Sequence, residues 1–187
     1  MKKLTVRDLT YMAMGVALLA VCSWISVPAV LPTGVPFTLQ TFAVCVVTAL
    51  LGARLGFWTV AGYILLGAVG LPVFSGFRGG FAALLGPTGG YIVGFLFTAL
   101  AVGLPAERLG RKTPVLIASM AAGILLCYVF GTAWFVVVYT RSRGAVDVLT
   151  AISWCVLPYL LPDGLKIALA AVLTRRLYPL LRKERTA

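Results

Sequence analysis

The sequence predicts an all-α membrane protein with six transmembrane helices and both termini in the cytoplasm. Of its 187 residues, 61% are hydrophobic and only 11% are charged, which is unlike a soluble globular domain. The apolar residues fall into long runs, and a hydrocarbon core needs about 20 helical residues per crossing. The lysines and arginines gather between alternate runs, as they do in multi-pass membrane proteins.

The composition also limits the function. The length accommodates about six crossings with short connections, so we expect a single transmembrane domain over residues 1–187. The formal net charge of +11 does not predict nucleic-acid binding, because the basic residues form no stripe with exposed aromatic residues. The cysteines lack metal-type spacing and there is no histidine, so we expect no metal, no cofactor and no enzymatic activity.

The first three predicted helices cover residues 8–27, 38–51 and 55–70. We expect the first to be a membrane helix and not a cleavable signal peptide, because it has the length of a span and prolines follow it. Residues 28–37 are expected to form a loop, because Pro28, Pro32 and Gly34 break helical pairing. Only Gly52, Ala53 and Arg54 separate the second helix from the third, which predicts a tight turn and an antiparallel hairpin.

The second half of the chain predicts three more helices. Residues 71–80 are rich in glycine and proline, so we expect them to fold inward as a lid or a cavity wall. A fourth helix follows residues 86–90 and reaches residue 103, and a fifth covers residues 114–139. The last runs from residue 148 to residue 181 and is expected to break at Pro158 and Pro162.

The basic residues predict the orientation. On the amino-terminal side lie Lys2, Lys3, Arg7, Arg54, Arg108, Arg111, Lys112, Arg175, Arg176, Arg182, Lys183 and Arg185. Opposite them lie only Arg78, Arg141 and Arg143. Positive charge in short loops stays in the cytoplasm, so both termini are expected there, in a multi-pass protein of the cell membrane. The even number of crossings agrees with this orientation.

Asp163 and Lys166 are the most informative polar residues, because they lie three positions apart in an apolar helix and share one face. A charge near the bilayer centre costs about 2.5–3.5 kcal/mol on insertion scales, so such residues face a cavity or a partner. In a purely structural interpretation, Asp163 is a first-turn acid and Lys166 neutralises it. In a binding interpretation, the carboxylate accepts from N–H groups of a solute and the ammonium donates to its carbonyl or carboxylate.

Two further segments allow both structural and binding roles. Gln40 can offer its amide to a solute, or it can bond to another helix without any ligand. The run GPTGGY at residues 86–91 lacks the GK[ST] ending of a nucleotide-binding loop, so ATP binding on this chain is not predicted. Its glycines suit close helix packing, and they equally suit a cavity wall that includes Tyr91.

Ala13 and Ala17, on either side of Gly15, form a small-residue face on the first helix. Small residues let another membrane helix approach closely. The spacing is common, so by itself it indicates a partner only weakly.

Four motifs follow one another along the chain: VPFTLQT at residues 35–41, GLPVF at 70–74 with the glycines at 79–80, GPTGGY at 86–91 and PDGLK at 162–166. Taken in this order, they resemble the BioY family, the biotin-binding S components of energy-coupling factor (ECF) transporters. The resemblance extends over nearly the whole chain, and the ordered set is more specific than any one motif.

The resemblance implies high-affinity capture of biotin and its uptake across the cytoplasmic membrane. It implies two ATP-binding subunits that power delivery through a transmembrane coupling subunit, and contact of Ala13 and Ala17 with that subunit. With biotin as the ligand, Asp163 is expected to accept from a ureido N–H. Lys166 is expected to donate to the ureido oxygen or the carboxylate, and Arg78 is a second candidate for the carboxylate.

Two other functions stay open at this point. One is an S component for a different vitamin, such as thiamine or riboflavin, with the same architecture. The other is a structural membrane protein in which Asp163 and Lys166 need only each other.

Overall fold

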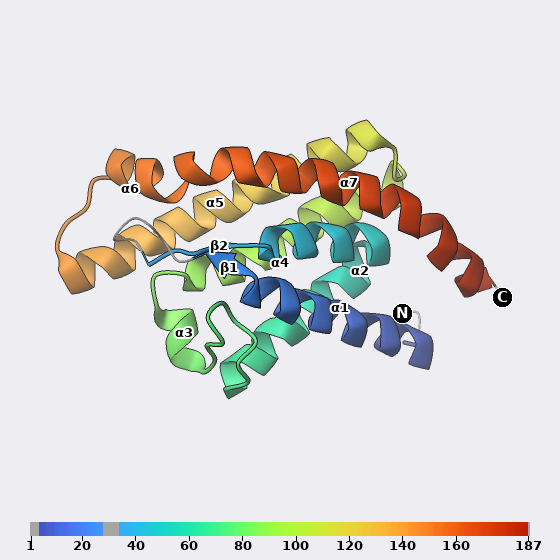
Figure 1. The fold of residues 1–187 in the computed structure, drawn as a ribbon, viewed down its shortest axis with the longest axis horizontal. Coiled ribbons are helices and arrows are strands. Elements are labelled where there is room, and N and C mark those ends of the chain that lie inside the picture. The colour runs from blue at the N-terminus through green and yellow to red at the C-terminus, as the bar shows by residue number, and fades with distance from the viewer. Residues whose placement is uncertain (1–3, 28–33, 187) are drawn as a thin grey trace.

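The structure, a computed structural model, describes residues 4–27 and 34–186. Pro28, Pro32 and the leader residues Lys2 and Lys3 therefore lie outside the described residues. Within the described ranges the chain forms helices and a pair of two-residue strands (Figure 1). In chain order these are α1 (Val6–Trp24), β1 (Ser26–Val27), β2 (Phe37–Thr38), α2 (Gln40–Val69), α3 (Phe81–Leu85), α4 (Gly89–Arg108), α5 (Thr113–Arg143), α6 (Val148–Cys155) and α7 (Leu157–Thr186).

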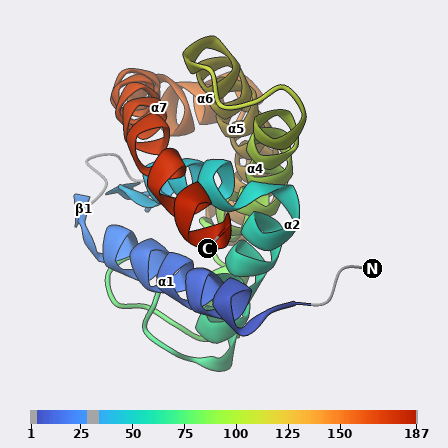
Figure 2. The ribbon, with the colours of Figure 1, turned by 90° about the vertical axis from the view of Figure 1, so that its right-hand side faces the viewer.

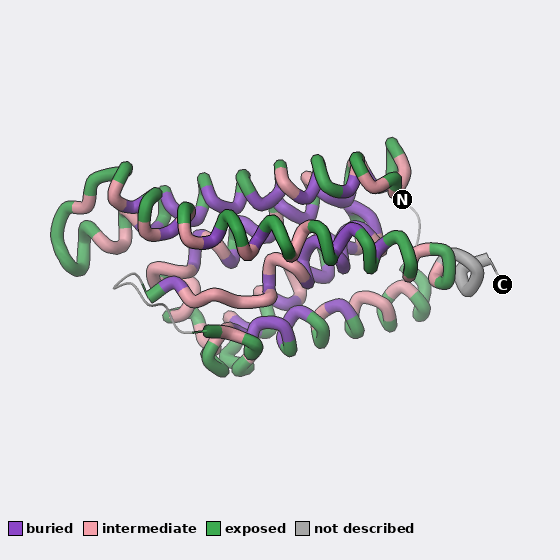
Figure 3. The backbone as a smooth tube through the Cα atoms, turned by 45° about the horizontal axis from the view of Figure 1, so that its top comes forward, coloured by how far each residue is buried: buried purple, intermediate pink, exposed green. Residues whose placement is uncertain are grey.

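Five helices in the described part of the chain are long and apolar enough to cross a membrane: α1, α2, α4, α5 and α7. Seen from the end of the bundle, α2 lies inside, with α1, α4 and α7 packed against it (Figure 2). Burial is highest along α2 and α4, whereas the outer faces of α1, α5 and α7 expose leucine, valine and phenylalanine (Figure 3). Such apolar outer faces suit contact with lipid tails.

Helix α2 consists of two arms that meet at Gly52, which confirms the predicted hairpin. Gly52 has φ 86°, in the left-handed region that glycine adopts without steric cost. The two arms are antiparallel and pack against one another. Gly56 packs against Thr48 near the turn, and at the far end from Gly52 the Gln40 side chain donates to the Tyr63 hydroxyl. The two arms together with α1, α4, α5 and α7 give the six predicted helical passes within the described residues.

Two charged side chains at the α4–α5 turn bond to backbone groups on either side of the helix break at Gly52. The N–H of Ala53 donates to Oε1 of Glu107 at 3.1 Å, which caps the start of the second arm. Arg111 donates from Nε to the carbonyl oxygen of Ala49 at 2.7 Å, which caps the end of the first arm. Its guanidinium also lies 3.6 Å from the ring centroid of Tyr178 in α7. The polar backbone groups freed at the break thus find partners inside the bundle, as a membrane requires.

The beginning of α1 and the end of α7 lie at the same end of the bundle (Figure 1). This agrees with an even number of passes and with both termini on one side of the membrane. The irregular residues 71–80, α3 and α6 gather at the opposite end. Following the charge pattern, we refer to this second end as the outer end.

Several predicted helix boundaries differ from the structure. Helix α4 continues to Arg108 and not only to residue 103, and α5 continues to Arg143 and not only to residue 139. Helix α1 ends at Trp24 and not at residue 27, because Ser26 and Val27 pair with β2 in antiparallel register. The last helix does not break at Pro158 and Pro162; the break is at Val156 (φ −121°, ψ −56°), between α6 and α7.

Both prolines belong to α7. Pro158 lies in the first turn, where a missing N–H breaks no helical bond, and Pro162 is accommodated inside the helix. Asp163 consequently lies beyond the first turn of α7, so the interpretation of Asp163 as a first-turn acid is wrong.

Candidate solute-binding site

A cavity of about 650 Å³ lies at the outer end of the bundle. This volume is in the range of about 300–1,000 Å³ that small-molecule sites occupy. Its wall comes from α2, α4, α5 and α7 and from the irregular residues 71–80. All the residues predicted to bind a ligand line it: Asp163, Lys166, Gln40, Arg78 and Tyr91.

Asp163 is buried, at 4% exposure, and its carboxylate receives hydrogen bonds from three side chains. Oδ1 accepts from Nζ of Lys166 at 2.7 Å and from Oγ1 of Thr41 at 3.0 Å. Oδ2 accepts from the hydroxyl of Tyr128 at 2.5 Å. The charge of this carboxylate is therefore neutralised and hydrogen-bonded, which a buried charge requires.

Lys166 has an acceptor for each proton of its ammonium group. Besides Asp163, Nζ donates to the carbonyl oxygen of Thr38 at 2.6 Å and to Oγ1 of Thr41 at 3.3 Å. An ammonium group carries three donors and no acceptor. Lys166 therefore contacts a solute oxygen only by exchanging one of these three bonds.

The same face of α7 holds the chain just before α2. The Tyr159 hydroxyl donates to the carbonyl oxygen of Val35, and its ring stacks on Phe37 with centroids 4.1 Å apart and planes at 16°. Tyr159, Asp163 and Lys166 follow helical spacing, so all three point to one side. Residues 34–41 thereby become part of the cavity wall.

Gln40 takes the structural role that the sequence allowed and still lines the cavity. Its Nε2 donates to the Tyr63 hydroxyl at 2.7 Å, and its Oε1 accepts from Oγ1 of Thr38 at 3.0 Å. The Tyr63 hydroxyl in turn donates to the carbonyl oxygen of Val73 at 3.0 Å. An amide offers two N–H donors and a carbonyl with two lone pairs, so the bonds to described residues leave Gln40 one donor and one acceptor for a solute.

Residues 71–80 form a cavity wall, as predicted. Phe74 is buried, with its ring 5.5 Å from that of Tyr63, and it pairs with Arg78 through backbone bonds. At the outer side, Trp24 donates from Nε1 to the carbonyl oxygen of Pro72 at 2.8 Å. The irregular chain is thus fixed to both α1 and α2.

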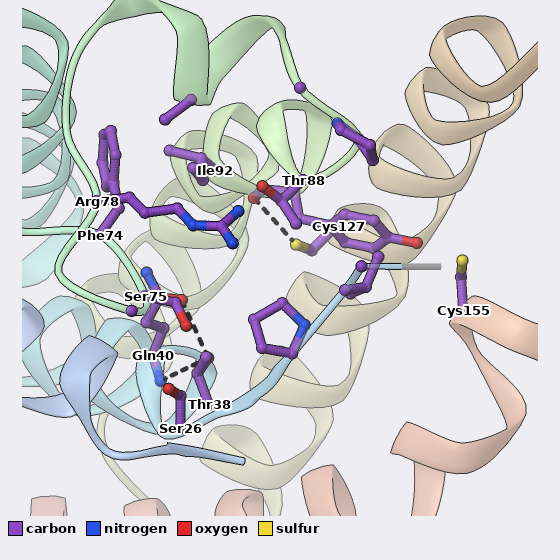
Figure 4. Close-up of a pocket in the computed structure, with 18 of the residues that line it drawn as sticks. Ser26, Thr38, Gln40, Phe74, Ser75, Arg78, Thr88, Ile92, Cys127 and Cys155 are labelled. Carbon is purple, nitrogen blue, oxygen red and sulfur yellow. Dashed lines mark hydrogen bonds between the residues drawn. The ribbon is translucent and has the colours of Figure 1, made fainter. Parts of the chain in front are cut away.

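Arg78 extends from this wall into the middle of the cavity (Figure 4). Asp163 already has Lys166 as its ion-pair partner in this structure. No carboxylate of the described residues pairs with the Arg78 guanidinium, which leaves its planar fork of donors facing the cavity.

The GPTGGY segment contributes both to helix packing and to the cavity wall. Gly90 packs directly against Trp134, and Gly131 against the ring of Tyr91. The hydroxyl of Tyr91 lies 3.1 Å from Oγ1 of Thr132. All four cysteines are buried, and two of them, Cys127 and Cys155, line the cavity (Figure 4).

The cavity therefore has two chemically different polar regions. Asp163 is buried, Lys166 is half-buried and the pair has no net charge, whereas Arg78 is exposed and carries a positive charge. Apolar side chains such as Ile92 and Phe95 line other parts of the cavity. This arrangement suits a solute with a neutral, hydrogen-bonding head, an apolar middle and an anionic tail.

Sequence reasoning missed three residues that hold the site together: Thr41, Tyr128 and Tyr159. Thr41 belongs to the VPFTLQT motif, but its hydroxyl had no assigned partner. Tyr128 stands in the middle of a long apolar helix, and a polar tip at that depth is the signal that points to an interhelical bond.

Ala13 and Ala17 lie away from the cavity. Both are exposed on α1, whereas Gly15 between them is buried against Thr59 and Val47 of α2. The small-residue face therefore points outward, where a partner helix can reach it.

Comparison with known proteins identifies the family. The family model described as the BioY family matches residues 1–183. The chain belongs to the BioY family. The biotin transporter BioY of Thermotoga maritima is 39% identical over 171 residues, which cover 91% of this chain and 95% of that protein. The biotin transporter BioY2 of Lactococcus lactis is 40% identical over 136 residues, with 72% of each chain covered.

The fold comparison agrees with this family. This BioY family member matches the crystal structure of the S component for biotin from an ECF-type ABC transporter with a TM-score of 0.83. The match covers 94% of both chains at 27% sequence identity. The predicted all-α membrane architecture is thus confirmed over nearly the whole chain.

Proposed function

We propose that this chain is the biotin-binding S component of an ECF-type transporter, which captures biotin and takes it up across the cytoplasmic membrane. The observation that carries the proposal is the cavity of a BioY family member, with a buried neutral ion pair in one wall and an exposed arginine in another. Biotin has matching chemistry: a ureido head with N–H donors and a carbonyl, an apolar middle and a carboxylate tail. The names of the relatives describe transport and not an enzymatic reaction.

The proposed ligand contacts follow from the donors and acceptors of the cavity. Asp163 accepts from a ureido N–H, and Lys166 donates to the ureido oxygen by giving up one intramolecular bond. Arg78 binds the carboxylate, for which a guanidinium fork has the right geometry. Gln40 contributes its remaining amide donor and acceptor, and Tyr91 contributes to the wall.

The proposed partners are a transmembrane coupling subunit and two ATP-binding subunits, with the lipid bilayer as solvent. Ala13 and Ala17 contact the coupling subunit from the exposed face of α1. Residues 1–187 act as one substrate-binding domain, because the cavity wall draws on elements from β1 to α7.

Equilibrium binding to the purified chain in detergent tests the proposal. Biotin, thiamine and riboflavin are titrated separately, and only biotin is expected to bind tightly. Asp163→Asn should weaken biotin binding by about 10–100-fold, the loss expected for one hydrogen bond to a charged group. Asp147→Asn is the matched control, since Asp147 is an exposed outer-end acid that caps α6 and does not line the cavity.

Tight binding of thiamine or riboflavin, but not of biotin, would mean that this S component carries a different vitamin. Binding of none of the three solutes would favour a structural role for the ion pair. Unchanged biotin affinity in Asp163→Asn would contradict the assigned contact.

A further inference from the structure

The two oxygens of the Asp163 carboxylate have different surroundings. Oδ1 receives two donors, from Lys166 and Thr41. Oδ2 receives one donor among the described residues, the Tyr128 hydroxyl. A carboxylate offers about four lone-pair sites, two on each oxygen. The free acceptor site is therefore on Oδ2, next to Tyr128.

Tyr128 reaches this oxygen from a different helix. It belongs to a set of buried α5 residues that recur at helical spacing and face the bundle interior, together with Ile124, Gly131 and Phe135. Its side chain is 6% exposed and lines the cavity beside Asp163. The 2.5 Å separation of the two oxygens is typical of a hydroxyl that donates to an ionised carboxylate.

We infer that Tyr128 is a positioning residue for the ligand: it fixes the Asp163 carboxylate so that Oδ2 presents a single acceptor to a ligand N–H. This inference rests on the proposed capture of biotin and assigns the Asp163 contact to one atom. Lys166 and Thr41 hold one side of the carboxylate and Tyr128 holds the other, which prevents rotation that would exchange the two oxygens.

This arrangement predicts that the site prefers ligands with an N–H group at Oδ2 of Asp163. The single free lone pair of Oδ2 accepts an N–H, whereas a carbonyl at the same place would face a negative oxygen. A ring of the same shape without N–H groups leaves this buried acceptor without its partner, which costs binding free energy. Tyr128 therefore contributes to the choice of a ureido ring over an N-alkylated one.

A purely structural role is the competing explanation, in which the Tyr128 hydroxyl only joins α5 to α7. The two roles differ in whether the effect of the Tyr128 hydroxyl on binding depends on Asp163. A structural bond affects every ligand equally, whereas a positioning bond acts through Asp163 and matters only for ligands that donate to it.

The experiment uses the full chain in detergent, with Tyr128→Phe, Asp163→Asn and the double variant. Tyr178→Phe is the control, because it removes one tyrosine hydroxyl far from the cavity lining. The ligands are biotin and a biotin analogue with methyl groups on both ureido nitrogens. Tyr128→Phe should lower biotin affinity about tenfold, as expected for a hydrogen bond to a charged group.

The dimethyl analogue and the double variant decide between the positioning role and the structural role of Tyr128. Tyr128→Phe should change the weaker affinity for the dimethyl analogue by about twofold or less, and it should add little to Asp163→Asn. Tyr178→Phe should bind biotin like the unaltered chain. Wild-type biotin affinity in Tyr128→Phe, an equal loss for both ligands, or fully additive losses in the double variant would each overturn the inference.

An infrared measurement separates this inference from the proposed function. Tyr128→Phe should shift the carboxylate stretching band of Asp163, which is identified as the band that Asp163→Asn removes. If the unaltered chain does not bind biotin, the proposed function fails, and the band shift still decides whether Tyr128 positions the carboxylate. An unshifted band overturns the inference whatever the ligand.

Discussion

Replacing Lys166 by methionine tests how far the buried ion pair depends on its ammonium group. Methionine keeps a long, flexible chain of similar shape and removes the charge. Asp163 would then keep a carboxylate in a side chain that is only 5% exposed. Tyr128 and Thr41 still donate to it, but neither carries a positive charge.

The magnitude follows from the bonds that are lost. Removing one partner of a buried ion pair costs about 3–5 kcal/mol, because the remaining charge stays buried. The carbonyl oxygen of Thr38 also loses its 2.6 Å bond to the ammonium. We therefore expect Lys166→Met to lower the free energy of unfolding by about 3–5 kcal/mol. Adding Asp163→Asn removes the stranded charge and should restore most of that free energy, while biotin binding stays weak.

The assay is denaturant unfolding in mixed micelles, with biotin titrations on the same preparations. The single variant, the double variant and the unaltered chain are compared. The reasoning is refuted if Lys166→Met unfolds like the unaltered chain, or if the double variant is no more stable than the single one. Either result would mean that the charge is hydrated and not buried in the bundle.

Three further predictions concern other parts of the molecule. Gly52→Ala should lower the free energy of unfolding by at least about 1–2 kcal/mol, because φ is 86° there and Glu107 fills the space for a Cβ. Wild-type stability of this variant in unfolding experiments would contradict the account of the helix break at Gly52. Arg78→Gln should lower biotin affinity about tenfold and leave the affinity for biotin methyl ester unchanged, with Arg141→Gln as the outer-end control; an equal loss for acid and ester would exclude a carboxylate contact. Ala17→Leu should bind biotin normally and lose co-purification with the coupling subunit, and retained co-purification would remove this face as the contact.

Much of the fold could be predicted from the sequence, because a membrane restricts the choices. Backbone groups in the bilayer need internal partners, so apolar runs become helices of predictable length. The short connection at Gly52 forced a tight turn, and the structure has the hairpin there. Asp163, Lys166 and Gln40 stand out as polar groups in apolar segments, whereas Arg78 follows only from the family resemblance, and all of these residues line one cavity.

Other features depend on packing between distant segments. The sequence shows that Asp163 needs partners, but the donors Thr41 and Tyr128 come from helices whose faces are fixed only in the folded bundle. The sequence predicts the break of the last helix at its prolines, because proline disfavours a helix interior. In the structure Pro158 lies in the first turn and Pro162 is accommodated, so the break falls at Val156.

The placement of charge also implies how the proposed ligand is oriented. The ion pair in α7 has no net charge, and therefore it can lie buried among the helices. Among the described residues no carboxylate pairs with Arg78, and its side chain is exposed in the outer segment of residues 71–80, where water can solvate it. A solute that satisfies both regions must place its neutral ureido head inward and its carboxylate toward the outside. The membrane thus dictates the orientation, because the unpaired cation that attracts the carboxylate is tolerated only near water.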